Sequence, residues 1–255
     1  MKIGSYNIDV SLIVGVLFVV ILPVLLSGYG YDHFFNVEYS WLRIILLWIL
    51  SLIILYVVMN LLLMIICTIW GKGRLVKSIV KKIRLSGDEE ILNLGCSRGL
   101  FAIQLAKRLS EGKVFCIDIR QDNRSLGEGL DSLKRTVKDS GVAERIVLSD
   151  ANPKKMSFQT GKFDLIINNL VLHEVKPYEE REKILKEMAR VIKPGGMIII
   201  VDLQYTREYK TFFNFLGWKK VARSPLRWMM FPPVRIVTAI KPGANKKAVP
   251  ETLPK

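Results

Sequence analysis

The chain has 255 residues, of which 50% are hydrophobic, and carries a formal net charge of +15. That length allows one soluble domain of ordinary size plus an appendage. Two histidines and three cysteines exclude a His-rich metal site and a disulfide framework, and neither CxxC nor HExxH occurs. We therefore expect no metal site, and we expect reduced thiols in a cytosolic domain.

Two uncharged apolar segments lie in the N-terminal part of the chain. Residues 10–26, VSLIVGVLFVVILPVLL, are near the lower length limit for crossing a bilayer, whereas residues 44–70 are long enough to span it with tilt. The alternatives are a cleaved signal peptide for the first segment, which Asp9 and Pro23 disfavour, and a buried core helix for the second, which its uncharged length disfavours. The sequence predicts a transmembrane hairpin over residues 1–73, with spans at about 10–27 and 42–70.

Basic residues set the expected orientation of this hairpin. The connecting loop, residues 27–40, contains Asp32 and Glu38 but no Lys or Arg, whereas the second segment is followed by Lys72, Arg74, Lys77, Lys81, Lys82 and Arg84. The positive-inside rule then predicts a multi-pass protein of the cell membrane with its C-terminal part in the cytosol. These cations would meet anionic lipid of the bilayer. Because no aromatic-basic RNA motif, zinc knuckle or helix-turn-helix is present, no nucleic-acid partner is expected.

Strands and helices alternate from about residue 89. We predict strands at 91–94, 113–119, 145–149, 163–168 and 197–202, and helices at 100–109, 122–140 and 179–192. This alternation predicts a parallel sheet with helices on both faces. A helix at 209–215 and two strands at 218–222 and 234–240 would then close the sheet with an antiparallel strand. Residues 193–196, KPGG, are expected to stop the preceding helix in a tight turn. The predicted domain covers 74–242, and residues 243–255 are expected to be a disordered tail.

The segment ILNLGCSRGLF, residues 91–101, predicts a sharp strand-to-helix turn at Gly95 and Gly99. One interpretation is a turn that holds no ligand. A nicotinamide dinucleotide fingerprint requires G-x-G-x-x-G, and Leu100 occupies its third position. The turn does not match a Walker phosphate-binding loop either, because no Gly-Lys-Ser/Thr follows.

Residues 89–240 resemble the class I S-adenosylmethionine-dependent methyltransferases. The resemblance is carried by NLGCSRG at 93–99, by the acid that ends the second strand, by Asp150-Ala151 after the third strand, by NNLVLHE at 168–174, and by RVIKPGG at 190–196. It implies a Rossmann-like sheet and S-adenosyl-L-methionine as cofactor. Asn93 and Ser97 depart from the family's first acid and middle glycine. Asn93 offers no full charge to the cofactor's amino group, and Ser97 narrows the space.

The resemblance also implies roles for single residues. Glycine would let the backbone approach the cofactor, Asp118 would accept both ribose hydroxyls, and Asp150 with the Ala151 amide would meet the adenine edge. The implied cofactor-binding residues are Asn93, Gly95, Cys96, Ser97, Gly99, Asp118, Ile119, Asp150, Ala151 and Asn168.

The loop after the fourth strand faces the methyl group in this family, which makes Asn169, His173 and Glu174 the catalytic candidates. His173 is interpreted either as a base near neutral pH or as a residue packed against the following helix. No Asn-Pro-Pro-Tyr follows that strand, which disfavours methylation of amino-purines or glutamine amides. The motif NLVLHEV is more similar to the corresponding motif of small-molecule and lipid methyltransferases, including those that methylate a quinone-ring carbon.

The sequence thus predicts a membrane-anchored methyltransferase that acts on a lipophilic or membrane-associated acceptor, such as a lipid, quinone or isoprenoid. The alternatives are a methyltransferase of membrane proteins or peptides and a catalytically inactive membrane scaffold. Residues 223–233, RSPLRWMMFPP, are predicted either to contact the membrane interface or to pack over the edge of the sheet.

Overall fold

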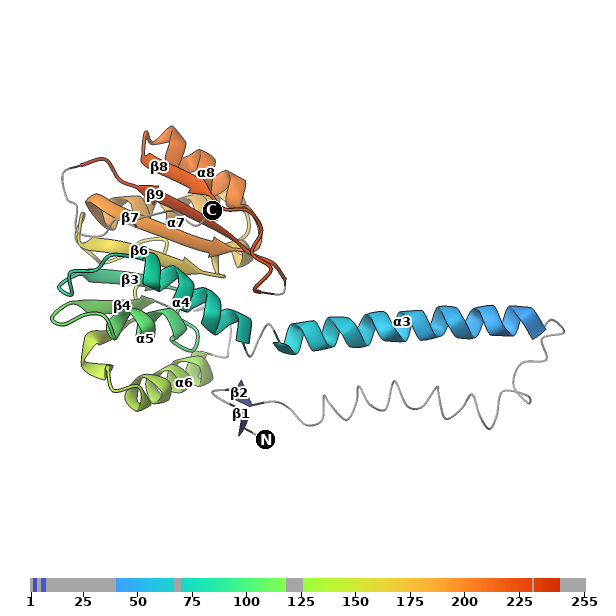
Figure 1. Cartoon of the computed structure of the whole chain (residues 1–255). Coiled ribbons are helices and arrows are strands. Elements are labelled where there is room, and N and C mark those ends of the chain that lie inside the picture. Colours follow the sequence, from blue (N-terminus) through green and yellow to red (C-terminus); the bar gives the residue numbers. More distant parts are fainter. Residues whose placement is uncertain are drawn as a thin grey trace. The chain divides into compact units, whose positions relative to one another are not determined.

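A computed structural model describes residues 2–3, 6–7, 40–66, 70–117, 126–230 and 232–243 (Figure 1). The chain divides into two compact units, Met1–Gly71 and Lys72–Lys255. The first predicted membrane segment and nearly all of the predicted tail lie outside the described residues.

The first unit contains one long helix, α3 (Ser40–Ile66). At about 1.5 Å per residue its 27 residues reach about 40 Å. The window Trp48–Ile65 has a mean hydropathy of 2.6 and no buried residue, so α3 could cross a membrane by length and composition. Within the described residues it is the one helix that meets this test. The short strands β1 (Lys2–Ile3) and β2 (Tyr6–Asn7) pair with each other.

The second unit is built on a seven-stranded sheet with the order β5-β4-β3-β6-β7-β9-β8. Its strands are β3 (Glu90–Leu94), β4 (Lys113–Ile117), β5 (Ile146–Ser149), β6 (Phe163–Asn169), β7 (Ile192–Asp202), β8 (Lys219–Arg223) and β9 (Arg235–Ile240). The first five are parallel, β9 is antiparallel to β7, and β8 is antiparallel to β9. The predicted parallel sheet with an antiparallel closing hairpin is therefore confirmed.

Helices cover both faces of this sheet (Figure 1). They are α4 (Lys72–Lys82), α5 (Leu100–Ala106), α6 (Leu126–Asp139), α7 (Tyr178–Val191) and α8 (Thr206–Phe215), with 3-10 turns η2 (Ala143–Arg145) and η3 (Leu172–Glu174). One buried cluster joins α4, α5 and α6 to one face, for example through Ile79 and Leu105, while Leu185 of α7 and Phe213 of α8 belong to the cluster on the other face. Burial on both faces accounts for the apolar runs at residues 165–167 of β6 and 197–201 of β7.

Helix α4 is fixed to α5 by Arg108. Its guanidinium donates to the carbonyl oxygens of Val80, in the last turn of α4, and of Ile83, the residue directly after α4. Since α5 runs away from the carboxyl ends of the parallel strands, α4 runs the same way, and its first residue, Lys72, lies at the carboxyl edge. Burial and the nearby charge of Arg98 lower the pKa of Lys72, which agrees with this placement.

The segment KPGG, residues 193–196, does not form the predicted tight turn. Residues 193–196 are not a turn between helix and strand but part of β7, which begins at Ile192 directly after α7. Gly195, with φ 79°, and a register shift opposite Phe163 and Leu165 make this start irregular. The Gly195 amide donates to the Lys241 carbonyl at 2.9 Å, and the Lys241 amide donates back to Gly196 at 3.0 Å. Pairing with the residue after β9 thus keeps this segment in the strand, although its local sequence pattern predicts a turn.

Candidate active site at the carboxyl edge of the sheet

The carboxyl ends of β3, β6 and β7 lie side by side. Leu94 pairs with Asn168, and Asn168 pairs with Ile200, so the turn after β3 and the loop after β6 meet at one edge. The structure therefore brings the predicted glycine turn together with Asn168, Asn169 and His173. This edge is where open α/β sheets bind their ligands.

The glycine turn, residues 95–99, packs against other segments of the domain, and its tip is exposed to solvent. A Cβ built on Gly95, whose φ is 76°, would lie 1.9 Å from the Val171 side chain and 2.9 Å from the Asn169 carbonyl oxygen. A Cβ on Gly99, with φ 78°, would lie 2.7 Å from Leu133 of α6. Contact with the loop after β6 and with α6 therefore requires glycine here, in addition to the cofactor approach that was predicted.

The remaining turn residues divide by exposure. Cys96 is buried, and its thiol donates to the Asn93 carbonyl at 3.1 Å. Ser97 is exposed and has a positive φ of 45°, in the region that glycine favours. The Gly95 amide donates to the Ile117 carbonyl at 2.9 Å, which ties the turn to the end of β4. Asp118 and Ile119, which directly follow β4, lie outside the described residues.

Two buried amides at this edge have unpaired polar atoms. Asn93 is 1% exposed and its Oδ1 has no hydrogen-bond partner, while Asn168 is 0% exposed and neither its Oδ1 nor its Nδ2 has one. An unpaired buried polar group costs about 1–3 kcal/mol. Such groups at the ligand-binding edge fit a site in which a bound molecule supplies the missing partners.

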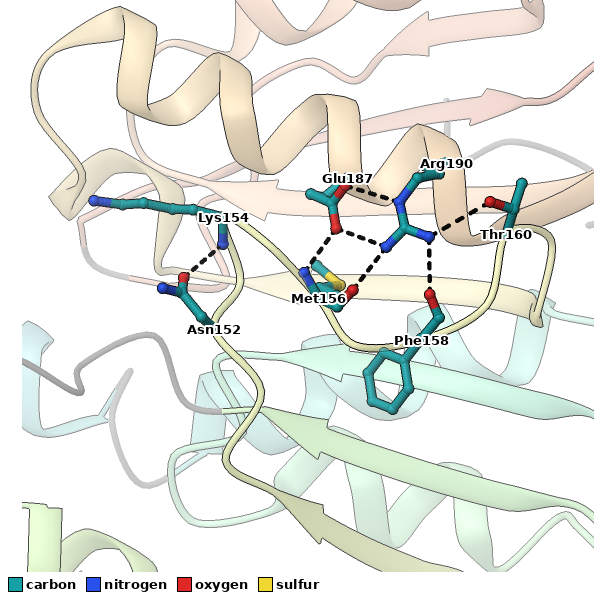
Figure 2. A network of polar contacts seen from close by, with 7 residues as sticks. All are labelled: Asn152, Lys154, Met156, Phe158, Thr160, Glu187 and Arg190. Carbon is teal, nitrogen blue, oxygen red and sulfur yellow. Dashed lines mark hydrogen bonds and ion pairs between the residues drawn. The ribbon is translucent and has the colours of Figure 1, made fainter.

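The predicted adenine side follows β5. Asp150 is exposed, and the backbone amide of Ala151 donates to the Ser149 hydroxyl at a long 3.3 Å. The chain then returns along the sheet as residues 152–160, and two residues of α7 hold it there. Their contacts are drawn in Figure 2.

Arg190 and Glu187 hold residues 156–160 against α7. Arg190 donates to the carbonyls of Met156 and Phe158, each at 2.8 Å, and Glu187 accepts from the Met156 amide at 2.7 Å (Figure 2). Arg190 also bonds Glu187 through Nε and through an Nη at 2.8 Å. The hydrogen bond from Arg190 is the main reason that the pKa of Glu187 is lowered. This network explains the arginine of the RVIKPGG motif, because it fixes the segment that follows Asp150.

His173 lies against a buried carboxylate that the sequence analysis did not single out. Its Nδ1 is 2.6 Å from Oδ1 of Asp202, and its backbone amide donates to Oδ2 of the same residue at 3.1 Å. Asp202 ends β7, is 0% exposed, and also accepts from the Leu203 amide and the Tyr209 hydroxyl. Burial raises the pKa of Asp202, while His173 and the hydrogen bonds from Leu203 and Tyr209 oppose that rise. An acid that ends a central apolar strand was the signal that could have revealed it.

Arg181 holds the loop that carries His173. The guanidinium is almost fully buried, donates to the Val175 carbonyl and to Glu208, both at 2.9 Å, and lies 3.7 Å from the centre of the Tyr205 ring. The loop is thereby fixed between α7 and α8. Of the other catalytic candidates from the sequence, Asn169 is half-buried and Glu174 is exposed at the end of η3.

A groove of about 1110 Å³ lies elsewhere, between α7 and α8, with Tyr178, Arg207, Phe215 and Trp218 in its lining. It includes none of the predicted site residues, so its size does not identify the ligand site. The chemistry-bearing side chains gather instead at the carboxyl edge.

Fold and site together define a class I methyltransferase domain, and comparison with known proteins agrees. Residues 92–200 match the family described as Methyltransferase domain. This part of the chain is therefore similar to methyltransferase domains.

Particular relatives act on different small molecules. The chain is similar to sterol 4-C-methyltransferase strm-1 of Caenorhabditis elegans, with 27% identity over 51% of this chain and 36% of the relative. It is also similar to demethylmenaquinone methyltransferase of Listeria monocytogenes, with 25% identity over 60% of this chain and 58% of the relative. It thus spans well under two thirds of either relative's length.

A solved structure shows the same fold. Magnesium protoporphyrin IX methyltransferase from Synechocystis PCC 6803, determined with bound S-adenosylmethionine, superimposes with a TM-score of 0.53 at 17% identity. The match covers 67% of this chain and 80% of that chain.

Replacing Gly95 by alanine should destabilise the domain by more than backbone strain alone. The matched control is Gly141→Ala, which shares a positive φ of 71° but has open space around its Cβ position. We expect the control to cost about 1–2 kcal/mol, and Gly95→Ala to cost about 1–3 kcal/mol more through steric overlap. Urea unfolding of both variants measures the difference. Equal losses would mean that Val171 moves aside without cost.

Removing the charge of Glu187 should weaken the domain in a pH-dependent way. A carboxylate whose folded pKa lies below its usual range stabilises the fold above that range, and this stabilisation is lost as pH falls through the folded pKa. Glu187→Gln should therefore be less stable than wild type at pH 7, with the difference shrinking at acid pH. Glu182→Gln, which removes an exposed pair with Lys186 at 3.1 Å, is the control and should change little. A difference independent of pH would contradict this account.

Proposed function

We propose that the protein is a membrane-anchored S-adenosylmethionine-dependent methyltransferase that acts on a lipophilic or membrane-associated small molecule, with its catalytic domain on the cytosolic side. The observation that carries the proposal is α3, an exposed helix with an 18-residue window of mean hydropathy 2.6, preceding the methyltransferase domain in the same chain. A soluble acceptor requires no anchor, whereas anchoring raises the effective concentration of the domain at a bilayer that contains the acceptor.

The names of the relatives support the class of acceptor. Sterols and menaquinone precursors are ring compounds that partition into bilayers, and they are the substrates named for the two relatives. Basic residues after α3, from Lys72 to Arg84, support the cytosolic placement. A second span at about 10–27 remains part of the proposal.

The buried edge fits the methyl donor. The residues that would hold it are Asn93 and Asn168, whose polar atoms lack partners, and the backbone of the turn at residues 95–99, with Asp118, Asp150 and Ala151 expected to contribute. When bound, S-adenosylmethionine supplies a methyl group on a positively charged sulfur. The protein's contribution is then to align the acceptor with that methyl group and to remove water from the site.

His173 is the proposed general base. Nδ1 lies 2.6 Å from a carboxylate oxygen of Asp202, so a proton on Nδ1 would face that carboxylate and leave the lone pair on Nε2. Nε2 can accept a proton from an acceptor hydroxyl or acidic ring carbon. The Asp202 carboxylate then stabilises the positive imidazolium, as a buried acid does for a catalytic histidine.

Replacing Asn168 by leucine should separate ligand binding from folding. The substitution removes two unpaired polar atoms from the core, so the free protein should be as stable as wild type or more stable. Affinity for S-adenosylmethionine, measured by titration calorimetry, should fall by about tenfold or more. Thr238→Val is the matched control, because Thr238 is also buried with an unpaired hydroxyl but lies within β9. Lower stability with unchanged affinity would assign Asn168 a purely structural role.

Activity is tested with radiolabelled S-adenosylmethionine and a total membrane extract, followed by solvent partition. Label in the lipid phase is the expected result. His173→Gln and Asp202→Asn should each lower kcat by about 10²–10⁴-fold without changing donor affinity. Tyr209→Phe is the control, since it removes one hydrogen bond from Asp202 and leaves His173 in place.

The other outcomes identify the alternatives. Label found only in protein would favour a methyltransferase of membrane proteins. Absence of donor binding would favour an inactive scaffold, since a fold does not by itself imply activity. Unchanged kcat in both His173→Gln and Asp202→Asn would restrict His173 to packing.

A further inference from the structure

The loop between β8 and β9, residues 224–234, of which all but residue 231 are described, exposes large apolar side chains at the same edge as the site. Arg235, the first residue of β9, pairs with Asp202 at the end of β7, so the loop that enters β9 reaches the carboxyl edge beside Asp202. Trp228 is 70% exposed and Met229 is 40% exposed. Leu226, at 37%, adds to the same surface.

This exposure does not come from a loosely held loop. Arg227 and Val234 pair through two backbone hydrogen bonds of 2.8 and 3.3 Å, which place Trp228 and Met229 inside a closed turn. The Ser224 amide donates to the Ile236 carbonyl at 2.8 Å, and the Ile236 amide donates back to the Ser224 hydroxyl at 2.9 Å. The loop is thus fixed to β9 at both its base and its middle.

Other residues of the loop face inward. Met230 and Val234 are buried in the core cluster that contains residues of α4 and α5. Apolar side chains that could complete the core have therefore already done so, and Trp228 and Met229 are left on the outside. A rigid turn that displays a tryptophan and a methionine to solvent fits a contact surface better than a core element.

The charges within the loop and its two flanking residues have one sign. The segment 223–235 contains Arg223, Arg227 and Arg235 and no acidic residue. Burial is the main cause that lowers the pKa of Arg223, and the nearby charges of Arg235 and Arg207 add to it. Lys72 and Arg98 add two more cations at this edge. A cationic surface carrying an exposed tryptophan matches the headgroup region of an anionic bilayer, where indole rings concentrate.

We propose that the 224–234 loop is a membrane-contact element, in which Trp228 and Met229 enter the headgroup region of an anionic bilayer and the flanking arginines meet lipid phosphates. The carboxyl edge of the domain then faces the lipid from which the acceptor is drawn, an inference that rests on the proposed function. Helix α4 also begins at this edge, and its first residue follows α3 after residues 67–71, so the covalent tether enters the domain on the same side.

The test uses the full-length chain reconstituted in vesicles with and without brominated lipid, a quencher that acts only at short range. Because the chain has 5 tryptophans, the emission of Trp228 is obtained as the difference between wild type and Trp228→Phe. We expect brominated lipid to quench this difference at least threefold in vesicles with anionic lipid, and less in purely zwitterionic vesicles. Trp218→Phe is the control, because Trp218 packs on Phe213 at the opposite end of β8 and its emission should not respond.

A functional readout accompanies the spectroscopy. Trp228→Ser should raise KM for an acceptor presented in anionic vesicles by about 3–10-fold, with donor affinity unchanged. Phe215→Ser, which removes an 88% exposed aromatic from the far end of α8, should leave KM unchanged.

The proposal would be overturned if brominated lipid did not quench the emission of Trp228. If the same emission shifted with protein density in the vesicles, the loop would instead contact a second copy of the chain. Equal quenching in both vesicle types would contradict the role of the arginines. Quenching of Trp228 without any labelled lipid would defeat the proposed function and leave the membrane contact standing, whereas labelled lipid without quenching would do the reverse.

Discussion

The contact between the turn after β3 and the loop after β6 is the constraint on which the site depends. Gly95 lies so close to Val171 and the Asn169 carbonyl that no side chain fits between them. This close packing sets the distance between the turn that holds the cofactor and the loop that carries His173. The parallel register of β3, β6 and β7 brings the three strand ends together, and the glycine fixes their connections at contact distance. The proposed donor site and the proposed base are thereby positioned by the same part of the fold.

Some polar groups at the carboxyl edge have hydrogen-bond partners within the protein, and others have none. Asp202 accepts from Leu203 and Tyr209 and binds His173, while Arg181 holds the same loop through Val175, Glu208 and Tyr205. Nearby, Asn93 and Asn168 have buried polar atoms without partners. Two atoms of that network, His173 Nδ1 and Arg181 Nε, also lack a hydrogen-bond partner, but the network is held in place by its other bonds, whereas Asn168 has no side-chain bond at all. The unpaired amides destabilise the free domain, and hydrogen bonds to a bound ligand would offset that loss of stability.

Much of this arrangement was predictable from sequence because it depends on local patterns. Apolar runs predicted the strands, glycines predicted the turn, and the motif order predicted the class of enzyme. Long-range partners were not predictable in the same way. Asp202 reads as the end of a strand, and its role depends on His173 lying beside it. Residues 193–196 read as a break, yet pairing with Lys241 makes them part of β7. Gly95 was expected to face the cofactor, and its packing against Val171 became visible only in three dimensions.

The candidate catalytic residues, the proposed lipid-contact loop and the first residue of α4 lie at the same edge of the domain. The β8–β9 hairpin is antiparallel, so its connecting loop must return to the carboxyl edge, where Asp202 already lies. Helix α4 begins at that edge because Arg108 fixes its other end beside the end of α5. Neither feature is needed for methyl transfer from a soluble donor to a soluble acceptor. Both are useful if the acceptor has to leave a bilayer by a short path, because a domain that faces the lipid with its active edge need not carry the apolar substrate through water.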